Sequence, residues 1–203
     1  MLEELDTLIV FIQKEYDELI NRWKKSDLYS SFNQKITLVK DINQDNNILK
    51  QILNYRNFIN ENNLYLKMRF EGLSLKSKFN TRVKAQNSIE DKVENYMTDK
   101  HENGAVPINK SFNDIFGVRI IFDEDVDYSI INNFIEKKYN KKYIKCTDSS
   151  KNTGYVATHV YFRRDNYNFQ WELQIWDKKH EKVNVESHEK YKQEYAKWEK
   201  ENK

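Results

Sequence analysis

Two acidic residues stand beside apolar runs in which strands are expected. Asp114 precedes the run GVRIIF at residues 117–122, and Glu172 lies inside the run WELQIW at residues 171–176. A carboxylate in so apolar a run is costly to bury unless it is paired or bound to a cation. Two such carboxylates on neighbouring strands could build a Mg²⁺ site for phosphoryl chemistry. Taken alone, however, Glu172 is more often the solvated side of an edge strand.

Basic residues form a second candidate group in the stretch TRVKAQNSIEDK, residues 81–92. Arg82 and Lys84 share one face of an expected strand, because side chains alternate along strands, and Lys92 follows on a helix. Ser88 stands near the start of that helix, where free N–H groups favour phosphate. The group could hold the triphosphate of ATP, or Arg82 could stack on the adenine. Ordinary surface charge is the plain alternative.

The elements that must position these residues begin with helices. Apolar residues recur every three or four positions, the spacing of one helix face, at Leu5, Leu8, Ile9, Ile12, Tyr16, Leu19 and Trp23 and again at Ile48, Leu49, Ile52, Tyr55 and Ile59. Both stripes are expected to pack on the rest of the domain, and a partner or homo-oligomer surface is the alternative. From residue 64 the apolar residues alternate with polar ones, which is typical of strands.

The later patterns first predict a strand at 64–71 and, after a turn at Gly72, a second strand that runs through Lys84. A helix that starts at Asn87 or Ser88 and a polar loop at 99–111 follow. The rest of the chain is predicted to form a strand at 117–122, a helix at 127–138, strands around 142–147, 156–164 and 169–176, and a closing helix around 191–198. Helices followed by an interrupted mixed sheet predict an α/β (α+β) domain. We expect an N-terminal helical region at residues 1–62 and the main domain at residues 63–203.

The composition excludes several classes of protein. The formal net charge of +2 gives no global electrostatic reason to bind nucleic acid. A single cysteine, Cys146, excludes an intramolecular disulfide framework and a multi-cysteine metal site. No dinucleotide-binding, Walker or nucleophile-elbow glycine motif is present, and the four histidines lack zinc-like spacing. The acidic N-terminal segment is unlike a signal peptide, so a cytoplasmic protein is expected.

Five stretches, in chain order, resemble the synthetase domain of the RelA/SpoT family. They are RVKAQNSIEDK, similar to Arg-x-Lys-x-x-x-Ser-Ile-x-x-Lys; FNDIFGVRI, similar to Asp-Ile-x-Gly-x-Arg; KNTGYVATHV, similar to Lys-x-x-Gly-Tyr-x-x-x-His; WELQIW, similar to Glu-x-Gln; and ESHEKYK, similar to the Glu-His element near the end of that domain. Each stretch alone is a weak signal. Five in the right order and spacing, over roughly residues 75 to 195, are specific.

The resemblance implies a nucleotidyltransferase-like mixed sheet flanked by helices, and transfer of the β,γ-pyrophosphate of ATP to a nucleotide 3′-hydroxyl with Mg²⁺. It implies ATP-binding roles for Arg82, Lys84, Ser88, Lys92 and Arg119; catalytic roles for Asp114, Glu172, Gln174 and Tyr155, with Asp114 and Glu172 at the metal; and acceptor-binding roles for Lys151, Gly154, Tyr155 and His159. In this reading Arg82 and Arg119 flank the adenine, and the Tyr155 ring stacks on the acceptor base.

Four positions depart from the family pattern. Val156 stands where the family usually has a basic residue that holds the 5′ phosphates of GDP or GTP, Ala157 replaces a serine, and Trp176 and Asp177 replace Arg-Thr. The chain therefore resembles a small alarmone synthetase of the toxic type, which modifies the 3′-terminal adenosine of the tRNA CCA end and has an antitoxin protein as partner. Synthesis of (p)ppGpp from GDP or GTP is the alternative. A catalytically dead binding or immunity module is a remote one.

Overall fold

A five-stranded sheet organises the part of the chain that the structure describes. The computed structural model describes residues 1–150 and 154–201, without the side chains of residues 149–150, 188 and 191–201. The strands are β1 (Lys78–Val83), β2 (Phe116–Phe122), β3 (Ile144–Ser150), β4 (Val156–Phe162) and β5 (Trp171–Asp177), and their order in the sheet is β1-β2-β5-β4-β3. The pair β2 and β5 is parallel, and the other neighbours are antiparallel. The fold is therefore mixed α+β, as predicted.

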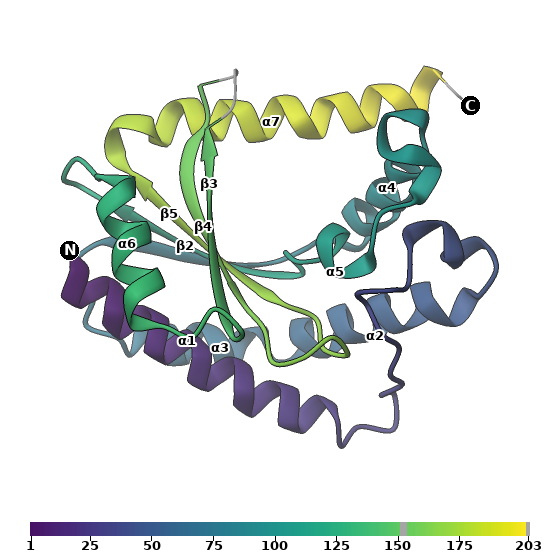
Figure 1. Ribbon diagram of the computed structural model, residues 1–203, viewed down its shortest axis with the longest axis horizontal. Coiled ribbons are helices and arrows are strands. Elements are labelled where there is room, and N and C mark those ends of the chain that lie inside the picture. The colour runs from purple at the N-terminus through teal and green to yellow at the C-terminus, as the bar shows by residue number, and fades with distance from the viewer. Residues whose placement is uncertain (151–153, 202–203) are drawn as a thin grey trace.

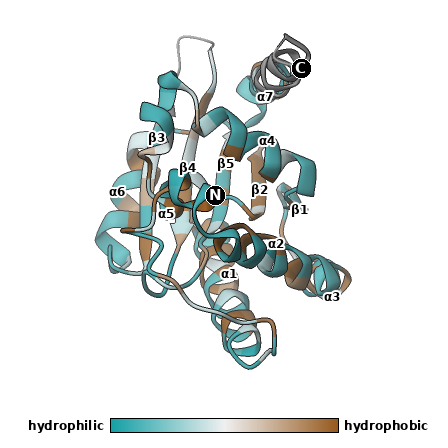
Figure 2. Cartoon of the chain, turned by 90° about the vertical axis from the view of Figure 1, so that its right-hand side faces the viewer, coloured by the Kyte–Doolittle hydropathy of each residue, from teal (hydrophilic) through white to brown (hydrophobic). Residues whose placement is uncertain are grey.

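Helices cover the two faces of the sheet unequally (Figure 1). They are α1 (Leu2–Trp23), α2 (Asn46–Glu61), α3 (Asn63–Glu71), α4 (Gln86–Tyr96), α5 (Ile108–Ser111), α6 (Tyr128–Lys138) and α7 (Lys178–Glu201), with short 3-10 helices at Val39–Asn43 and Asp99–Gly104. In Figure 1, α1, α2 and α3 lie below the sheet and α7 crosses above it. Hydrophilic and hydrophobic residues alternate along α1 and α2 in Figure 2, as expected for helices with one buried face.

The main hydrophobic core lies between the sheet and the N-terminal helices. It joins buried residues of α1 and α2, including Leu8 and Ile52, to Trp171, Leu173 and Ile175 of β5. Both predicted helix stripes therefore pack within the chain. Period-two alternation along β5 leaves Glu172, Gln174 and Trp176 on the opposite face, which is the face under α7.

The position of β5 decides between the two interpretations of Glu172. This strand is the middle one of the five, with β2 on one side and β4 on the other. Glu172 is only 6% exposed. The edge-strand alternative is therefore wrong, because the carboxylate lies at the centre of the sheet, where it needs a partner.

The segment 64–71, predicted as a strand, is the helix α3. Leu66 and Phe70 are fully buried, whereas Leu64 and Met68 are 70% and 65% exposed. Two residues advance about 200° around a helix, so Leu64 and Leu66 lie on opposite sides, whereas residues four apart share a side. The alternation of apolar and polar residues in this short segment is typical of a strand, in which all four apolar side chains would share one buried face. In the helix, two of the four apolar side chains face the core and the other two face solvent.

This assignment predicts different stabilities for two matched variants. Leu66→Ala should lower the free energy of unfolding by about 2–5 kcal/mol, because it leaves a cavity in the core. Leu64→Ala should change it by less than about 0.5 kcal/mol, because Leu64 faces solvent. Urea unfolding of the two variants provides the measurement. Equal losses would contradict the helix, since in a strand both side chains would share one face.

The remaining elements match the prediction in type and differ at their ends. The strand expected to run on from Gly72 begins only at Lys78, and the loop at 99–111 contains a 3-10 helix and α5. The strands β2, β3, β4 and β5 and the helices α4, α6 and α7 are confirmed; Asp127 caps α6 by accepting hydrogen bonds from the Ser129 and Ile130 N–H groups. In the described part of the chain, no helix is long and apolar enough to cross a membrane.

Candidate active site

The register of the sheet aligns three predicted site residues in one row across the face under α7. Arg119 of β2 pairs with Gln174 of β5, and Gln174 pairs in turn with His159 of β4. Glu172 stands two residues earlier on β5, so its side chain lies on the same face. Residues that are far apart in the sequence therefore meet at the centre of the sheet.

A continuous chain of hydrogen bonds links these side chains. The Tyr155 hydroxyl lies 2.9 Å from His159 Nε2, and His159 Nδ1 lies 2.7 Å from Glu172 Oε1. Gln174 Nε2 donates to Glu172 Oε2 at 2.8 Å, and the Arg119 guanidinium donates twice to Gln174 Oε1, at 3.1 and 2.9 Å. Each bond has one donor and one acceptor if His159 carries its proton on Nδ1, the tautomer that the Glu172 carboxylate favours.

The Glu172 carboxylate is held in its ionised form. Burial raises the pKa of this carboxyl and nearby Asp114 adds to that effect, but the hydrogen bonds that the carboxyl accepts from His159 and Gln174 outweigh both, so the pKa is lowered. The carboxylate is therefore charged at neutral pH, and both its oxygens accept hydrogen bonds. A fixed negative charge of this kind can hold a cation or orient a hydroxyl group.

Trp176 closes the chain into a ring of contacts. The Arg119 guanidinium stacks on the Trp176 ring at 3.6 Å from its centroid, and Tyr155 meets the same ring edge-on at 6.1 Å. Burial lowers the pKa of Arg119 to about 10, which still leaves the side chain charged at neutral pH. Tyr155 is only 4% exposed. Stacking of its ring on an acceptor base therefore requires that the ring first become accessible.

A second charged cluster lies at the start of β2. Lys84 Nζ lies 2.6 Å from Asp114 Oδ2, and Lys92 Nζ of α4 lies 3.2 Å from Asp114 Oδ1. Burial would raise the pKa of Asp114, but the two ammonium groups outweigh it and hold the pKa well below its ordinary value. Burial lowers the pKa of Lys84, and Asp114 opposes that shift. One carboxylate thus organises two of the predicted phosphate-binding lysines.

The other predicted ATP-binding residues lie around these two clusters. Arg82 is exposed, and its charge lowers the pKa of both Asp114 and Arg119, so it stands near both clusters. Ser88 is the third residue of α4, in the turn whose N–H groups lack helical partners. The two clusters also interact electrostatically, because the charge of Asp114 raises the pKa of Glu172.

The acceptor loop, which we define as residues 154–156, leads into β4 and includes its first residue, Val156. Gly154 has φ = +82°, a conformation that other residues adopt only with strain, so the backbone before Tyr155 suits a glycine. Alternation along β4 places Val156 on the face opposite His159. A basic residue at position 156 would therefore reach the acceptor side only around the end of the strand. Lys151, also predicted to bind the acceptor, lies outside the described residues.

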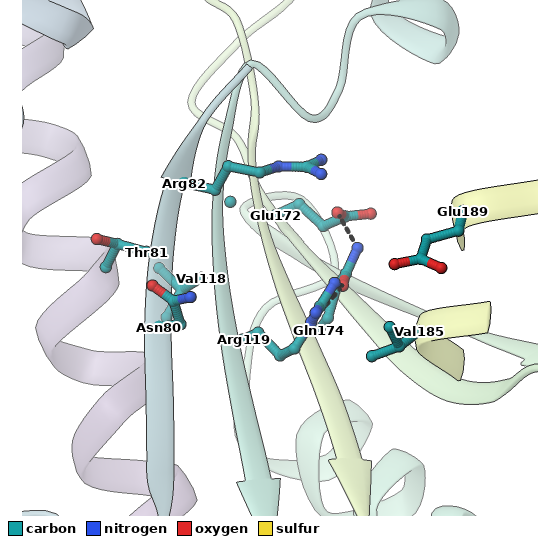
Figure 3. Close-up of a pocket in the computed structure, with 10 residues that line it drawn as sticks. Asn80, Thr81, Arg82, Val118, Arg119, Glu172, Gln174, Val185 and Glu189 are labelled. Carbon is teal, nitrogen blue, oxygen red and sulfur yellow. Dashed lines mark hydrogen bonds between the residues drawn. The ribbon is translucent and has the colours of Figure 1, made fainter. Parts of the chain in front are cut away.

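A pocket of about 260 Å³ opens between the sheet and α7 (Figure 3). Its walls include Arg82, Arg119 and Glu172, which were predicted, and Asn80 and Glu189, which were not. In Figure 3 the Glu189 side chain extends from α7 towards Glu172 and Gln174. Asn80 precedes Arg82 by two residues, so strand alternation could have identified it. The position of Glu189 depends on how α7 crosses the sheet, which no local pattern shows.

The two predicted metal-binding carboxylates fit Mg²⁺ in part. Mg²⁺ is usually bound by one or two carboxylates together with substrate phosphates and water, and both Asp114 and Glu172 are held ionised. Their oxygens are engaged by lysine, histidine and amide groups. In the described chain, no group of three or more His, Cys, Asp or Glu residues could hold a metal by itself. The residues therefore suit a cation that arrives with phosphate, because the phosphate can pair with Lys84 and Lys92 and so free the Asp114 oxygens for the cation.

Comparisons with known proteins relate the chain to a family. The family model described as a region found in RelA / SpoT proteins matches residues 81–196. No curated protein matches the chain significantly. A solved structure, the small alarmone synthetase 1 from Bacillus subtilis bound to its product pppGpp, is similar at 19% identity over 75% of this chain and 83% of that chain, with a TM-score of 0.41. The family model spans more than half of the sequence, so the chain belongs to the RelA/SpoT family of pyrophosphokinases.

Proposed function

We propose that the protein transfers the β,γ-pyrophosphate of ATP to the 3′-hydroxyl of a nucleotide, and that its preferred acceptor is the 3′-terminal adenosine of tRNA. The observation that carries the transfer is the Glu172 carboxylate. It is buried, ionised and exposed only towards a pocket that also presents the guanidinium groups of Arg82 and Arg119. Guanidinium groups both stack on planar rings and pair with phosphate oxygens.

The two clusters divide the work of this reaction. Arg82, Lys84 and Lys92 lie where they can neutralise the phosphates of ATP, and Mg²⁺ bound with those phosphates supplies further charge neutralisation. Glu172 orients the attacking hydroxyl and accepts its proton as the oxygen bonds to phosphorus, and His159 fixes the position of the carboxylate. Phosphoryl transfer suits such a site, because its catalysis is mostly positioning and electrostatic stabilisation.

The acceptor loop favours tRNA over a free nucleotide. Residues 154–157 read Gly-Tyr-Val-Ala and contain no cation that could hold the 5′ phosphates of GDP or GTP. Ala157, on the same face as His159, is buried beside Trp176. An acceptor held by its terminal base, with its other phosphates contacted further away, fits this surface better. We expect an antitoxin protein to neutralise such an activity.

Label transfer tests the acceptor. The protein, Mg²⁺ and γ-labelled ATP are incubated separately with GDP, GTP and deacylated tRNA, and with two matched controls: tRNA that lacks its terminal adenosine and tRNA whose terminal diol has been oxidised. We expect label on intact tRNA and none on either control. Label only on GDP or GTP would contradict the tRNA proposal. Label on none of them, with folded protein, would contradict the transfer reaction and favour a binding module.

Tyr155 variants test the stacking role. Tyr155→Ala should lower kcat/KM for the acceptor by about 5- to 150-fold, the equivalent of about 1–3 kcal/mol per stacked base, and leave the fold intact. Tyr155→Phe keeps the ring and loses the hydroxyl with its hydrogen bond to His159, so its loss of activity should be smaller. Steady-state kinetics and circular dichroism provide the measurement. Retained activity in the alanine variant would exclude stacking on Tyr155.

A further inference from the structure

One side chain of α7 holds the main chain of the acceptor loop. Asn184 is fully buried. Its Oδ1 accepts a hydrogen bond from the Val156 N–H at 2.9 Å, and its Nδ2 donates to the Val156 carbonyl oxygen at 2.8 Å. One amide therefore satisfies both main-chain groups of the residue that follows Tyr155.

The geometry explains why this position needs a side-chain partner. The pairing of β4 with β5 begins with Thr158 opposite Ile175, and β5 ends at Asp177. The N–H and C=O groups of one strand residue point to the same side, and Val156 lies two residues beyond the last residue of β4 that pairs with β5. The Asn184 amide donates and accepts as a strand residue would, so it takes the place of a strand partner for Val156.

Val183, the residue before Asn184, lies close to the other end of the acceptor loop. A Cβ atom at Gly154 would lie 3.0 Å from Val183 Cγ1, so α7 passes close to Gly154. Consecutive residues of α7 therefore contact the two residues that flank Tyr155. Between these contacts the Tyr155 ring lies against Trp176 with its hydroxyl on His159.

We propose that Asn184 is the positioning residue of the acceptor loop: it sets the place of Tyr155 through the main chain of Val156, and so determines how well the acceptor is used. The proposal rests on the proposed function, in which Tyr155 meets the acceptor. The groups proposed to bind the ATP phosphates, Arg82, Lys84 and Lys92, lie in β1, directly after it and in α4, whereas the side-chain hydrogen bonds of Asn184 go to Val156. We therefore expect loss of the amide to affect use of the acceptor more than binding of ATP.

Kinetics with three variants test this separation. Asn184→Ala removes both hydrogen bonds and should lower kcat/KM for the acceptor by up to about 100-fold, the scale of a 1 Å misplacement, with the KM for ATP unchanged. Asn184→Asp keeps the acceptor of the Val156 N–H and loses the donor, so it should fall between Asn184→Ala and the wild type. Lys179→Ala, an exposed change on the same helix, should match the wild type.

Hydrogen exchange at the Val156 amide gives a readout that does not depend on activity. It should become faster in Asn184→Ala while the melting temperature shows that the variant is folded; if that variant does not fold, Asn184→Asp carries the test. If the wild-type protein transferred label to no acceptor, the proposed function would be wrong, but hydrogen exchange at the Val156 amide would still test the contact with Asn184. An active Asn184→Ala with normal acceptor kinetics, an equal rise in the KM for ATP, or unchanged exchange would each overturn the positioning role.

Discussion

Replacing Glu172 by glutamine should lower kcat by about 10²–10⁴-fold, the usual contribution of a positioned acid–base group. The substitution keeps the size of the side chain and removes its charge. It also places an NH₂ group, which is a donor, opposite two groups that already donate in the wild type, since His159 Nδ1 and Gln174 Nε2 each point a proton at the carboxylate. One of these two hydrogen bonds must break or reverse. The ordered chain that leads to Tyr155 is then lost together with the negative charge.

The chain offers a matched control for this variant. Glu15 of α1 is also a fully buried carboxylate, and it is paired with Arg69 at 2.6 Å on the far side of the sheet from the pocket. Glu15→Gln should lower stability, because it leaves the arginine without its partner, and should leave kcat of the folded protein unchanged. Single-turnover rates and urea unfolding of both variants separate the two effects. Normal turnover by Glu172→Gln would exclude a catalytic role for this carboxylate.

Replacing Asp114 by asparagine should lower kcat by about 10²–10³-fold and raise the Mg²⁺ concentration needed for half-maximal rate. The loss corresponds to the several kcal/mol that a bound metal contributes by charge stabilisation. The variant also leaves Lys84 and Lys92 near each other without the carboxylate between them. Mg²⁺ titrations of the rate provide the measurement, and an unchanged Mg²⁺ requirement would contradict the metal role.

The stability of the same variant should depend on pH in a defined direction. The folded-state pKa of Asp114 is depressed, so the stability that this group contributes is fully present above its ordinary pKa of 3.8 and is lost as the pH falls below that value. Wild type should therefore be more stable than Asp114→Asn at neutral pH, and the difference should shrink in acid. Asp123→Asn, which removes a solvent-exposed partner of Lys178, should show little difference at any pH. A difference that grows in acid would contradict the pairing.

The residue types of the site could be predicted from the sequence, but their partners could not. Asp114 and Glu172 stood out because carboxylates are rare beside such apolar runs, and the five stretches indicated the family. Whether Glu172 lay at an edge or at the centre depended on strand order, which is a property of the whole sheet. The pairing of Asp114 with both lysines depended in the same way on how α4 packs.

Short segments and long-range contacts account for the errors and omissions. The alternation from Leu64 to Phe70 is compatible with a strand and with a helix, and only packing against α1 and the sheet decides between them. Asn184 gave no signal, because an asparagine inside a helix is ordinary until its neighbour across space is known. The stacking of Arg119 on Trp176 joins residues 57 positions apart by the numbering of the sequence.

The nucleotide left after transfer tests the central claim most directly. Attack of a 3′-hydroxyl oxygen on the β-phosphorus breaks the bond between the β-phosphorus and the oxygen that bridges it to the α-phosphate, so the acceptor gains pyrophosphate and AMP leaves. With α-labelled ATP in one reaction and γ-labelled ATP in a parallel one, we expect AMP to form in equal amount to labelled acceptor, and both to disappear in Glu172→Gln. Formation of ADP in step with acceptor labelling would show transfer of a single phosphoryl group and would contradict the assignment of this site to pyrophosphate transfer.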